Sequence, residues 1–401
     1  MKRICLKLLV ILAVNSTVVV GQSFEEERVR DLDLERIVRL AERMRGTPEP
    51  TTEGENPGKC GLRISFEIMK HWKDFSELQK QRLAQLFAQP ERQKRRTIGR
   101  FTIFYDTIGT NAPALIIPAR TPCQRIAGTV EAYIDSVGKF FNAVWNYETD
   151  SLGYAAPPVQ DDNTYWIDVH ELNAGLYGQT FFGPSNSFDP DPIDPGPPPR
   201  FRTYVEVDND YCTGENYYSR GMAGLKVTAA HEFHHAIQLG SYGYLPGDLY
   251  FYEITSTWME DVVYSDVNDY YQYLVNAPCG YPCSQFSTPD VHFTEYNGSI
   301  EYSRSIWGKF IEKRYSRDIM RYTWEGMRQS MTSIPAIDGA LEGIGSSFRQ
   351  AFLEWAWWNL NTGLTADTIK YYTEGRKYPS MDTTVVNYTP PQRIINDSIQ
   401  G

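Results

Sequence analysis

Residues 231–235 read His-Glu-Phe-His-His and match the pattern H-E-x-x-H. Residues four apart on an α-helix share one face, so His231 and His235 can present their ring nitrogens to one cation. Glu232 lies beside the pair, where its carboxylate can act as a general base. Uncharged residues on both sides favour a buried helix, and His234 is expected to pack or to form a hydrogen bond rather than to bind metal. The pattern predicts a catalytic site for one zinc ion.

A catalytic zinc ion needs a third protein ligand and keeps a fourth position for water. Residues 240–248 form a Gly-rich segment that can reverse the chain, and the helical segment after it carries Glu253 and Glu260. We predict Glu253 as the third ligand. Glu260 lies two turns further along the same face, where it can accept a proton from a ligand histidine. The alternative is Glu260 as ligand and Glu253 as a surface charge.

These residue types indicate hydrolysis by an activated water molecule. Zinc lowers the pKa of its water to about 7, and Glu232 takes the proton and later returns it to the leaving amine. A further donor is expected for the developing oxyanion. Tyr302, His292 and His170 are the candidates, and we favour Tyr302 because it precedes another predicted helix. Since the chain has 27 tyrosines, a role in the core or on the surface is the alternative for Tyr302.

Two acidic groups offer oxygen atoms of the kind that bind calcium. They are Asp189, Asp191 and Asp194 in a Pro-rich loop, and Asp208 with Asp210. Neither group has the ligand spacing of a defined calcium loop. We therefore favour solvated acidic loops for both groups, and a calcium ion is the alternative that the spacing does not support.

Strands and helices that position these residues follow from the hydrophobic pattern. Alternation predicts strands at 101–105, 165–169 and 203–207, and a long amphipathic helix is predicted at 127–145. The Asp- and Pro-rich residues 186–199 cannot form a regular element. After the strand at 203–207, helices are expected to dominate to about residue 374. Strands first and helices afterwards predict an α+β domain.

The N-terminal part has a different organisation. Residues 1–21 have the charged and apolar regions of a signal peptide, which predicts secretion. Residues 22–97 are expected to form helices at 24–45 and 76–89, separated by a Pro- and Gly-rich linker, and are a candidate propeptide. The basic residues 92–96, directly before a strand, are either a processing site or a solvated basic turn. The catalytic domain is predicted at 98–375, followed by an extended tail at 376–401.

Composition narrows the class of protein. With 401 residues, 41% of them hydrophobic, the chain can bury a large core. A net charge of -11 argues against nucleic acid or anionic membrane as a partner, and no later segment is long and apolar enough to be inserted in a membrane. After loss of Cys5 with the signal peptide, Cys279 and Cys283 could close a tight loop and Cys60 could reach Cys123. Cys212 would then be unpaired, although five cysteines allow several pairings.

Several segments resemble a family of secreted bacterial metalloproteases of the zincin type, with a glutamate as third metal ligand. The similarity covers most of residues 98–330, and two segments of the likeness depart from the family pattern, at 254–256 and at 118–128. The resemblance implies a twisted mixed sheet above the H-E-x-x-H helix and a mainly helical C-terminal half. It is carried by these segments: 226–233, 258–264, 266–270, 142–158 and 207–211.

The sequence therefore predicts a secreted zinc-dependent metallopeptidase that acts on extracellular proteins or peptides. One alternative is a zinc hydrolase of another amide, such as a cell-wall peptide. Another is a non-catalytic adhesion module on a zincin scaffold. Glu232 argues against the adhesion module, because a structural metal site does not need a carboxylate between two histidine ligands.

Overall fold

The structure is a computed structural model that describes residues 33–42, 59–84, 91–117, 120, 122–172, 176–182, 192–212, 217–275 and 284–381. Some predictions lie outside these residues. They are the signal peptide, the linker 46–58, Asp189, Asp191, the Cys279–Cys283 loop and the tail beyond residue 381.

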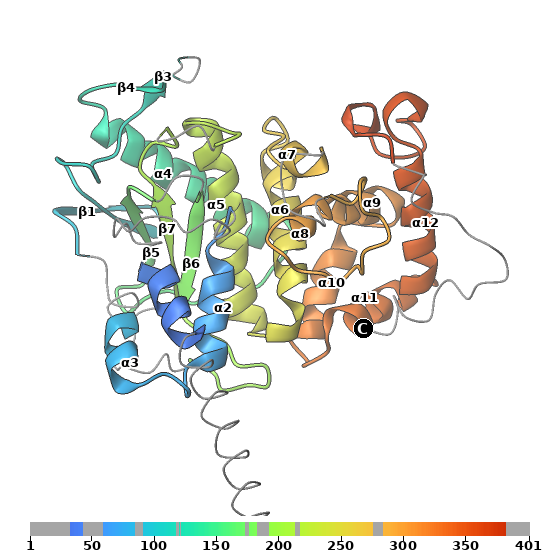
Figure 1. Ribbon diagram of the computed structural model, residues 1–401, viewed down its shortest axis with the longest axis horizontal. Coiled ribbons are helices and arrows are strands. Elements are labelled where there is room, and N and C mark those ends of the chain that lie inside the picture. Colours follow the sequence, from blue (N-terminus) through green and yellow to red (C-terminus); the bar gives the residue numbers. More distant parts are fainter. Residues whose placement is uncertain are drawn as a thin grey trace, which may run out of the picture.

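A five-stranded mixed sheet forms the first half of the described chain (Figure 1). The three inner strands run parallel, and the two edge strands are antiparallel to their neighbours. The inner strands are almost wholly buried, as expected when both faces of a sheet are covered. In spatial order the strands are β1 (Lys94–Ile98), β2 (Phe101–Tyr105), β5 (Tyr165–His170), β7 (Thr203–Asp208) and β6 (Gly178–Phe182).

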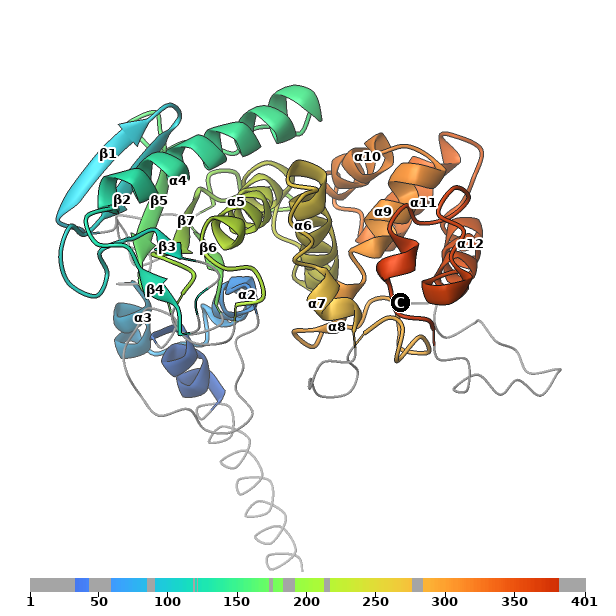
Figure 2. The same ribbon diagram turned by 90° about the horizontal axis from the view of Figure 1, so that it is seen from above.

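One face of this sheet is covered by α4 (Val130–Trp145) and α5 (Met222–Ile237) (Figures 1 and 2). On β2, Phe101 contacts the rings of Phe141 on α4 and Phe233 on α5. Because side chains alternate along a strand, residues one position away point to the opposite face. Phe101 therefore lies on the face that α4 and α5 cover, and its neighbour Thr102 points to the opposite face of the sheet.

The C-terminal half is helical and lies beyond α6 (Leu249–Val263), which packs against α5 (Figure 2). Aromatic contacts join its parts, as where Trp324 meets Phe251 and Tyr252 of α6. Residues 33–42 are helical, within the predicted helix 24–45. The other helices of the described chain are α2 (Leu62–His71), α3 (Glu77–Ala84), α7 (Tyr271–Leu274), α8 (Ile300–Ser303), α9 (Ile306–Arg314), α10 (Asp318–Met327), α11 (Ser333–Glu342) and α12 (Phe348–Leu360). Short π or 3₁₀ turns are η1 (Asn146–Ser151), η2 (Gln238–Tyr242), η3 (Pro246–Asp248), η4 (Gly363–Thr365) and η5 (Gly375–Lys377), and a small ribbon joins β3 (Ile116–Ile117) to β4 (Gln124–Arg125).

The three predicted strands, the helix that became α4 and the α+β arrangement are confirmed. The strands β1, β3, β4 and β6 and the helix α2 were not predicted. In α2 the apolar residues Leu62, Ile64, Phe66 and Ile68 alternate as they would in a strand, so the helical period is hidden. The prediction that residues 92–96 precede a strand is wrong, since β1 begins at Lys94 and pairs with β2.

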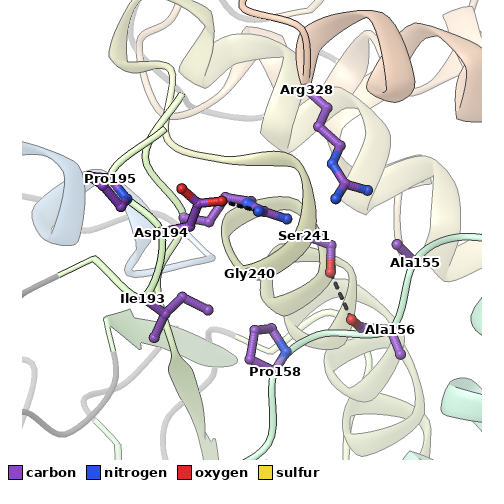
Figure 3. Close-up of a pocket in the computed structure, with 10 residues that line it drawn as sticks. Ala155, Ala156, Pro158, Ile193, Asp194, Pro195, Gly240, Ser241 and Arg328 are labelled. Carbon is purple, nitrogen blue, oxygen red and sulfur yellow. Dashed lines mark hydrogen bonds and ion pairs between the residues drawn. The ribbon is translucent and has the colours of Figure 1, made fainter. Parts of the chain in front are cut away.

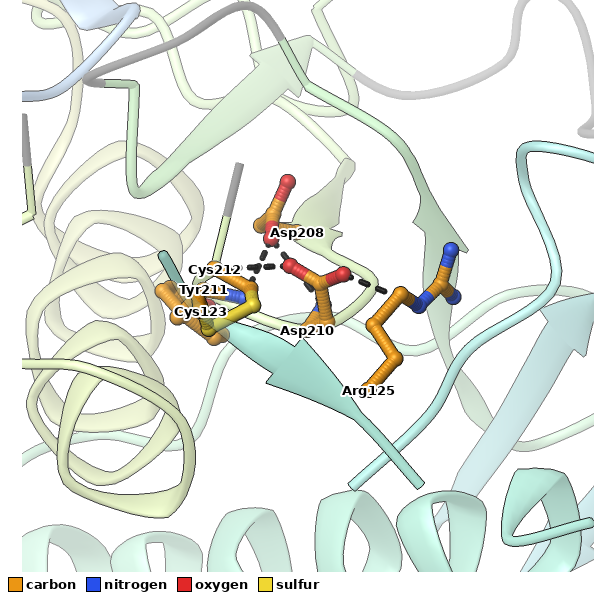
Figure 4. Close-up of a disulfide and its surroundings, with 6 residues drawn as sticks. All are labelled: Cys123, Arg125, Asp208, Asp210, Tyr211 and Cys212. Atoms are coloured by element: carbon orange, nitrogen blue, oxygen red, sulfur yellow. Dashed lines mark hydrogen bonds and ion pairs between the residues drawn. A yellow bond between two sulfur atoms is a disulfide. The ribbon is translucent and has the colours of Figure 1, made fainter. Parts of the chain in front are cut away.

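The predicted Cys60–Cys123 bridge is also wrong. Cys123 instead pairs with Cys212 (Figure 4). Cys60 is a buried free cysteine. The turn after β7 brings Cys212 beside the β3–β4 ribbon, with the two Cα atoms 5.6 Å apart. Such long-range proximity depends on the topology and not on spacing along the chain. Among the described residues, no helix is long and apolar enough to cross a membrane.

Candidate metal centre

Two histidines of α5 face each other across a short distance. His231 and His235 are buried, and their Nε2 atoms lie 3.0 Å apart. Every residue of α5 from Val227 to Ile237 is buried, because this helix lies between the sheet and α6. The four-residue spacing of the histidines therefore places two ring nitrogens together inside the protein, as the sequence predicted.

Glu253 of α6 completes a group of three. Its Oε2 atom lies 3.2 Å from His231 Nε2 and 3.5 Å from His235 Nε2. Burial alone raises the pKa of Glu253, but the two histidines outweigh burial and lower it to about 2. Neither carboxylate oxygen accepts a hydrogen bond from any described residue. A buried carboxylate that accepts no hydrogen bond from the described chain is costly unless positive charge compensates it.

Partners at Nδ1 fix the orientation of both imidazole rings. His231 Nδ1 donates to Glu260 Oε1 at 2.8 Å, and His235 Nδ1 donates to Gln238 Oε1 at 2.7 Å. With Nδ1 engaged, each ring directs Nε2 toward Glu253. Glu260 therefore occupies the outer position that the sequence suggested, and Glu253 the inner one. Gln238 was not predicted, although it stands one helical turn after His235.

Glu232 lies between α5 and the edge strand β6. The Thr180 hydroxyl donates to Glu232 Oε2 at 2.8 Å and holds the carboxylate in place. The strand can approach this closely because residue 178 is glycine. A Cβ atom on Gly178 would lie 2.9 Å from Glu232 Cγ and 2.6 Å from Thr228 Cγ2.

A fourth side chain, Cys60, lies with His231, His235 and Glu253, and these four residues form the candidate metal-binding group, called the metal-binding group below. Its Sγ atom and the ligand atoms of His231, His235 and Glu253 all lie within 4.8 Å of one another. Burial, followed by the negative charges of Glu232 and Glu253, raises the pKa of the Cys60 thiol well above its usual range. The group thus offers two nitrogen atoms, one carboxylate oxygen and one sulfur atom, a donor set that can hold a metal ion.

The three candidates for an oxyanion donor lie in different places. The ring of Tyr302, on α8, lies 6.2 Å from that of His231 and stacks on Tyr273. His292 is exposed. His170 lies on β5, within a separate cluster. Of the three, the structure brings Tyr302 to the metal-binding group.

His234 has the packing role that was predicted for it. Its Nδ1 atom lies 2.8 Å from Oε2 of Glu148, which belongs to η1. Burial lowers the pKa of His234 and raises that of Glu148, so the surroundings disfavour the charged form of each group. His234 is thus held by Glu148 and does not join the metal-binding group.

A second buried group lies in the sheet and consists of Asp168, His170 and Glu206. Asp168 pairs with Glu206 in the register of β5 and β7, so the two side chains share a face. Gln179 bonds Glu206, whereas the next residue, Thr180, bonds Glu232 of α5. Because side chains alternate, this sheet cluster lies on the face opposite α5.

The acidic residues considered for calcium have other partners. The interpretation of Asp208 and Asp210 as solvated is wrong, since both are buried (Figure 4). Asp208 accepts three backbone N–H groups, and Asp210 Oδ2 lies 3.1 Å from Arg125 Nε. Burial followed by the charge of Asp210 raises the pKa of Asp208 to about 7. These carboxylates stabilise the turn that carries Cys212. In the Pro-rich loop, Asp194 pairs with Arg200.

A cavity of about 450 Å³ lies beside η2, at the C-terminal end of α5 (Figure 3). Gly240 and Ser241 line it, together with residues of the Pro-rich loop, and Arg328 points toward it. The Ser241 hydroxyl donates to the Ala156 carbonyl at 2.8 Å. None of the predicted site residues lines this cavity, so it is separate from the metal-binding group.

Comparison with known proteins gives no match: no family model fits the sequence, and no curated protein is similar enough to be matched. The functional argument therefore depends on the residues of this chain.

Proposed function

We propose that this protein is a secreted, zinc-dependent peptidase of the zincin type, with His231, His235 and Glu253 as metal ligands. The observation that carries the proposal is the convergence of these three side chains on a common point, with both oxygens of Glu253 left without a hydrogen bond from the described chain. The disulfide Cys123–Cys212 supports an extracellular location, where such bonds persist.

The donor set suits zinc. Donor atoms of one tetrahedral zinc ion, each at about 2.0–2.1 Å, lie about 3.3 Å from one another. The three distances between the ligand atoms are 3.0, 3.2 and 3.5 Å. Glu260 and Gln238 add the outer partners that orient metal-binding histidines. When bound, zinc would supply Lewis-acid chemistry that polarises a carbonyl group and acidifies water.

Glu232 is the proposed general base. Its carboxylate lies one residue from His231 and is oriented by the Thr180 hydroxyl. It takes a proton from the attacking water and returns it to the leaving amine, so that no free charge remains in the buried site. Tyr302 is the proposed donor to the developing oxyanion, because its ring lies beside His231.

The test combines zinc content with hydrolysis of a mixed quenched-peptide library. The full chain carries Cys60→Ser, since the sulfur atom lies among the ligands, and is compared with the same chain carrying Glu232→Gln as well. We expect about one zinc ion per chain in both and a loss of cleavage only in the Glu232→Gln protein. Absence of zinc would contradict the metal site. Bound zinc without cleavage in the Cys60→Ser chain would contradict the proposed peptidase activity. It would favour a zinc hydrolase that acts on another kind of amide.

A further inference from the structure

The N-terminal region reaches the metal-binding group through Cys60. This residue immediately precedes Gly61, the N-cap of α2, and its Sγ atom accepts a hydrogen bond from the Leu62 N–H at 3.4 Å. Its side chain is 1% exposed, and it is the one free cysteine among the described residues. A buried cysteine beside two histidines and an ionised glutamate provides the ligand that zinc prefers in closed sites.

The same segment covers the outer edge of β6. The Tyr177 N–H donates to the Lys59 carbonyl at 2.9 Å, and the Gly61 N–H donates to the Gly178 carbonyl at 3.3 Å. Cys60 thereby pairs with Gly178 in a parallel bridge. An edge strand is where an extended peptide adds by main-chain hydrogen bonds, and this edge lies beside Glu232. Residues 59–61 therefore occupy the place that a peptide substrate would take.

A buried ion pair fastens this segment to the groups that orient the ligands. Lys59 Nζ lies 2.6 Å from Glu260 Oε2 and 2.6 Å from Asp269 Oδ2, and all three side chains are at most 2% exposed. Glu260 is the residue that bonds His231. The tether thus holds the backbone of residue 60 at the metal-binding group, independently of the sulfur atom.

Helix α2 continues the attachment along β6. Ser65 donates to the Thr180 carbonyl at 3.4 Å, and the Phe66 ring contacts Phe182, Tyr244 and Tyr252. Contacts of this extent hold Cys60 in one position rather than letting it sample the centre from a loose chain.

We propose that the N-terminal region keeps the enzyme latent, with the Cys60 thiolate as fourth ligand of the metal ion and Lys59–Gly61 across the substrate edge of β6. The proposal depends on the zinc peptidase function proposed above. Binding of the sulfur releases the thiol proton to solvent, as for other cysteine ligands. A fourth protein ligand takes the position that a catalytic site keeps for water, so the structure corresponds to the closed form. Loss of the sulfur alone makes the fourth position available to water, and full activation also requires displacement of residues 59–61 from the edge of β6.

X-ray absorption at the zinc edge tests the ligand directly in the zinc-loaded full chain. We expect one sulfur neighbour at about 2.3 Å in the wild type and none in Cys60→Ser, with equal zinc content. Ser65→Ala, which removes one bond between α2 and β6 but keeps the sulfur, should give the wild-type spectrum. Zinc with only nitrogen and oxygen neighbours in the wild type would overturn the latency proposal and leave the metal site standing. Absence of zinc would instead overturn the proposed function.

Peptide hydrolysis provides the second readout. Cys60→Ser should cleave the quenched-peptide library at least about tenfold faster than the wild type and Ser65→Ala, because the fourth position becomes available to water. Equal rates in the wild type and Cys60→Ser would overturn the inhibitory role of the sulfur. The spectrum of the wild type alone decides the question of the ligand if the variant fails to fold.

Discussion

The two buried groups of histidine and carboxylate side chains differ in what their charged atoms already contact. In the sheet cluster, Arg92 forms a two-point ion pair with Asp168, at 2.7 and 2.8 Å. Glu206 is bonded by Gln179 and by the Tyr204 hydroxyl. The metal-binding group of Cys60, His231, His235 and Glu253 is the helix cluster. There, Glu253 has the two histidine nitrogens nearby and no hydrogen bond from the described chain.

The difference shows that a histidine beside acidic groups is not sufficient to identify a metal site. In the sheet cluster, the negative charge of Asp168 is compensated by an arginine from a neighbouring segment. In the helix cluster, the partners bind the outer nitrogen of each histidine and leave the inner atoms facing one another. We therefore propose a stabilising role for the sheet cluster and a metal-binding role for the helix cluster.

The largest expected effect is on catalysis. In the Cys60→Ser chain, Glu232→Gln should lower peptide hydrolysis by about 100- to 10,000-fold, the usual contribution of a general base. Glu206→Gln is the matched change of a buried glutamate in the sheet cluster and should lower the rate by less than about tenfold. Initial rates on the quenched-peptide library measure both. Equal losses in the two variants would remove the distinction between the clusters.

The next effect is on stability. Arg92→Leu removes the cation that compensates Asp168, whose side chain is 1% exposed. Leaving such a charge unpaired should lower the free energy of unfolding by about 3 kcal/mol, with zinc content unchanged. Urea denaturation and elemental analysis of the same preparation measure the two quantities. Loss of zinc in Arg92→Leu would show that the sheet cluster also holds metal.

A smaller effect is expected from the outer partner of His231. Glu260→Gln retains the shape of the side chain but weakens its hold on the imidazole, and should reduce zinc affinity by about 10- to 100-fold. Competition with a chelator measures the affinity. Asp168→Asn is the control, and its zinc affinity should equal that of the wild type. An unchanged affinity in Glu260→Gln would contradict the orienting role of Glu260.

Local periodicity accounts for what could be predicted from the sequence. The spacing of His231 and His235 identifies one face of a helix, and the strands that the structure has at β2, β5 and β7 follow from alternation or continuous apolar runs. Glu253 and Glu260 could be predicted in the same way, because they lie two turns apart on one helix. The α+β arrangement follows from the order of these elements along the chain.

Contacts between distant segments could not be predicted. Cys60 reaches the metal-binding group only because Lys59–Gly61 pairs with the edge of β6, and β6 itself has no alternating pattern. Lys59 and Glu260 are 201 residues apart in the sequence. The pairing of Cys123 with Cys212 depends in the same way on a turn after β7. Register and topology, rather than residue spacing, determine these contacts.

The most direct test of the central claim is the zinc content of three full-length proteins, measured by elemental analysis after dialysis: Cys60→Ser, and the same chain that also carries Glu253→Ala or His170→Ala. The two variants truncate comparable buried side chains, one in each cluster, and circular dichroism verifies that both are folded. We predict about one zinc ion per chain in Cys60→Ser and when His170→Ala is added, and none when Glu253→Ala is added, because only two of the four ligands then remain. Zinc retained by Glu253→Ala, or lost from His170→Ala, would contradict the assignment of the metal to the helix cluster.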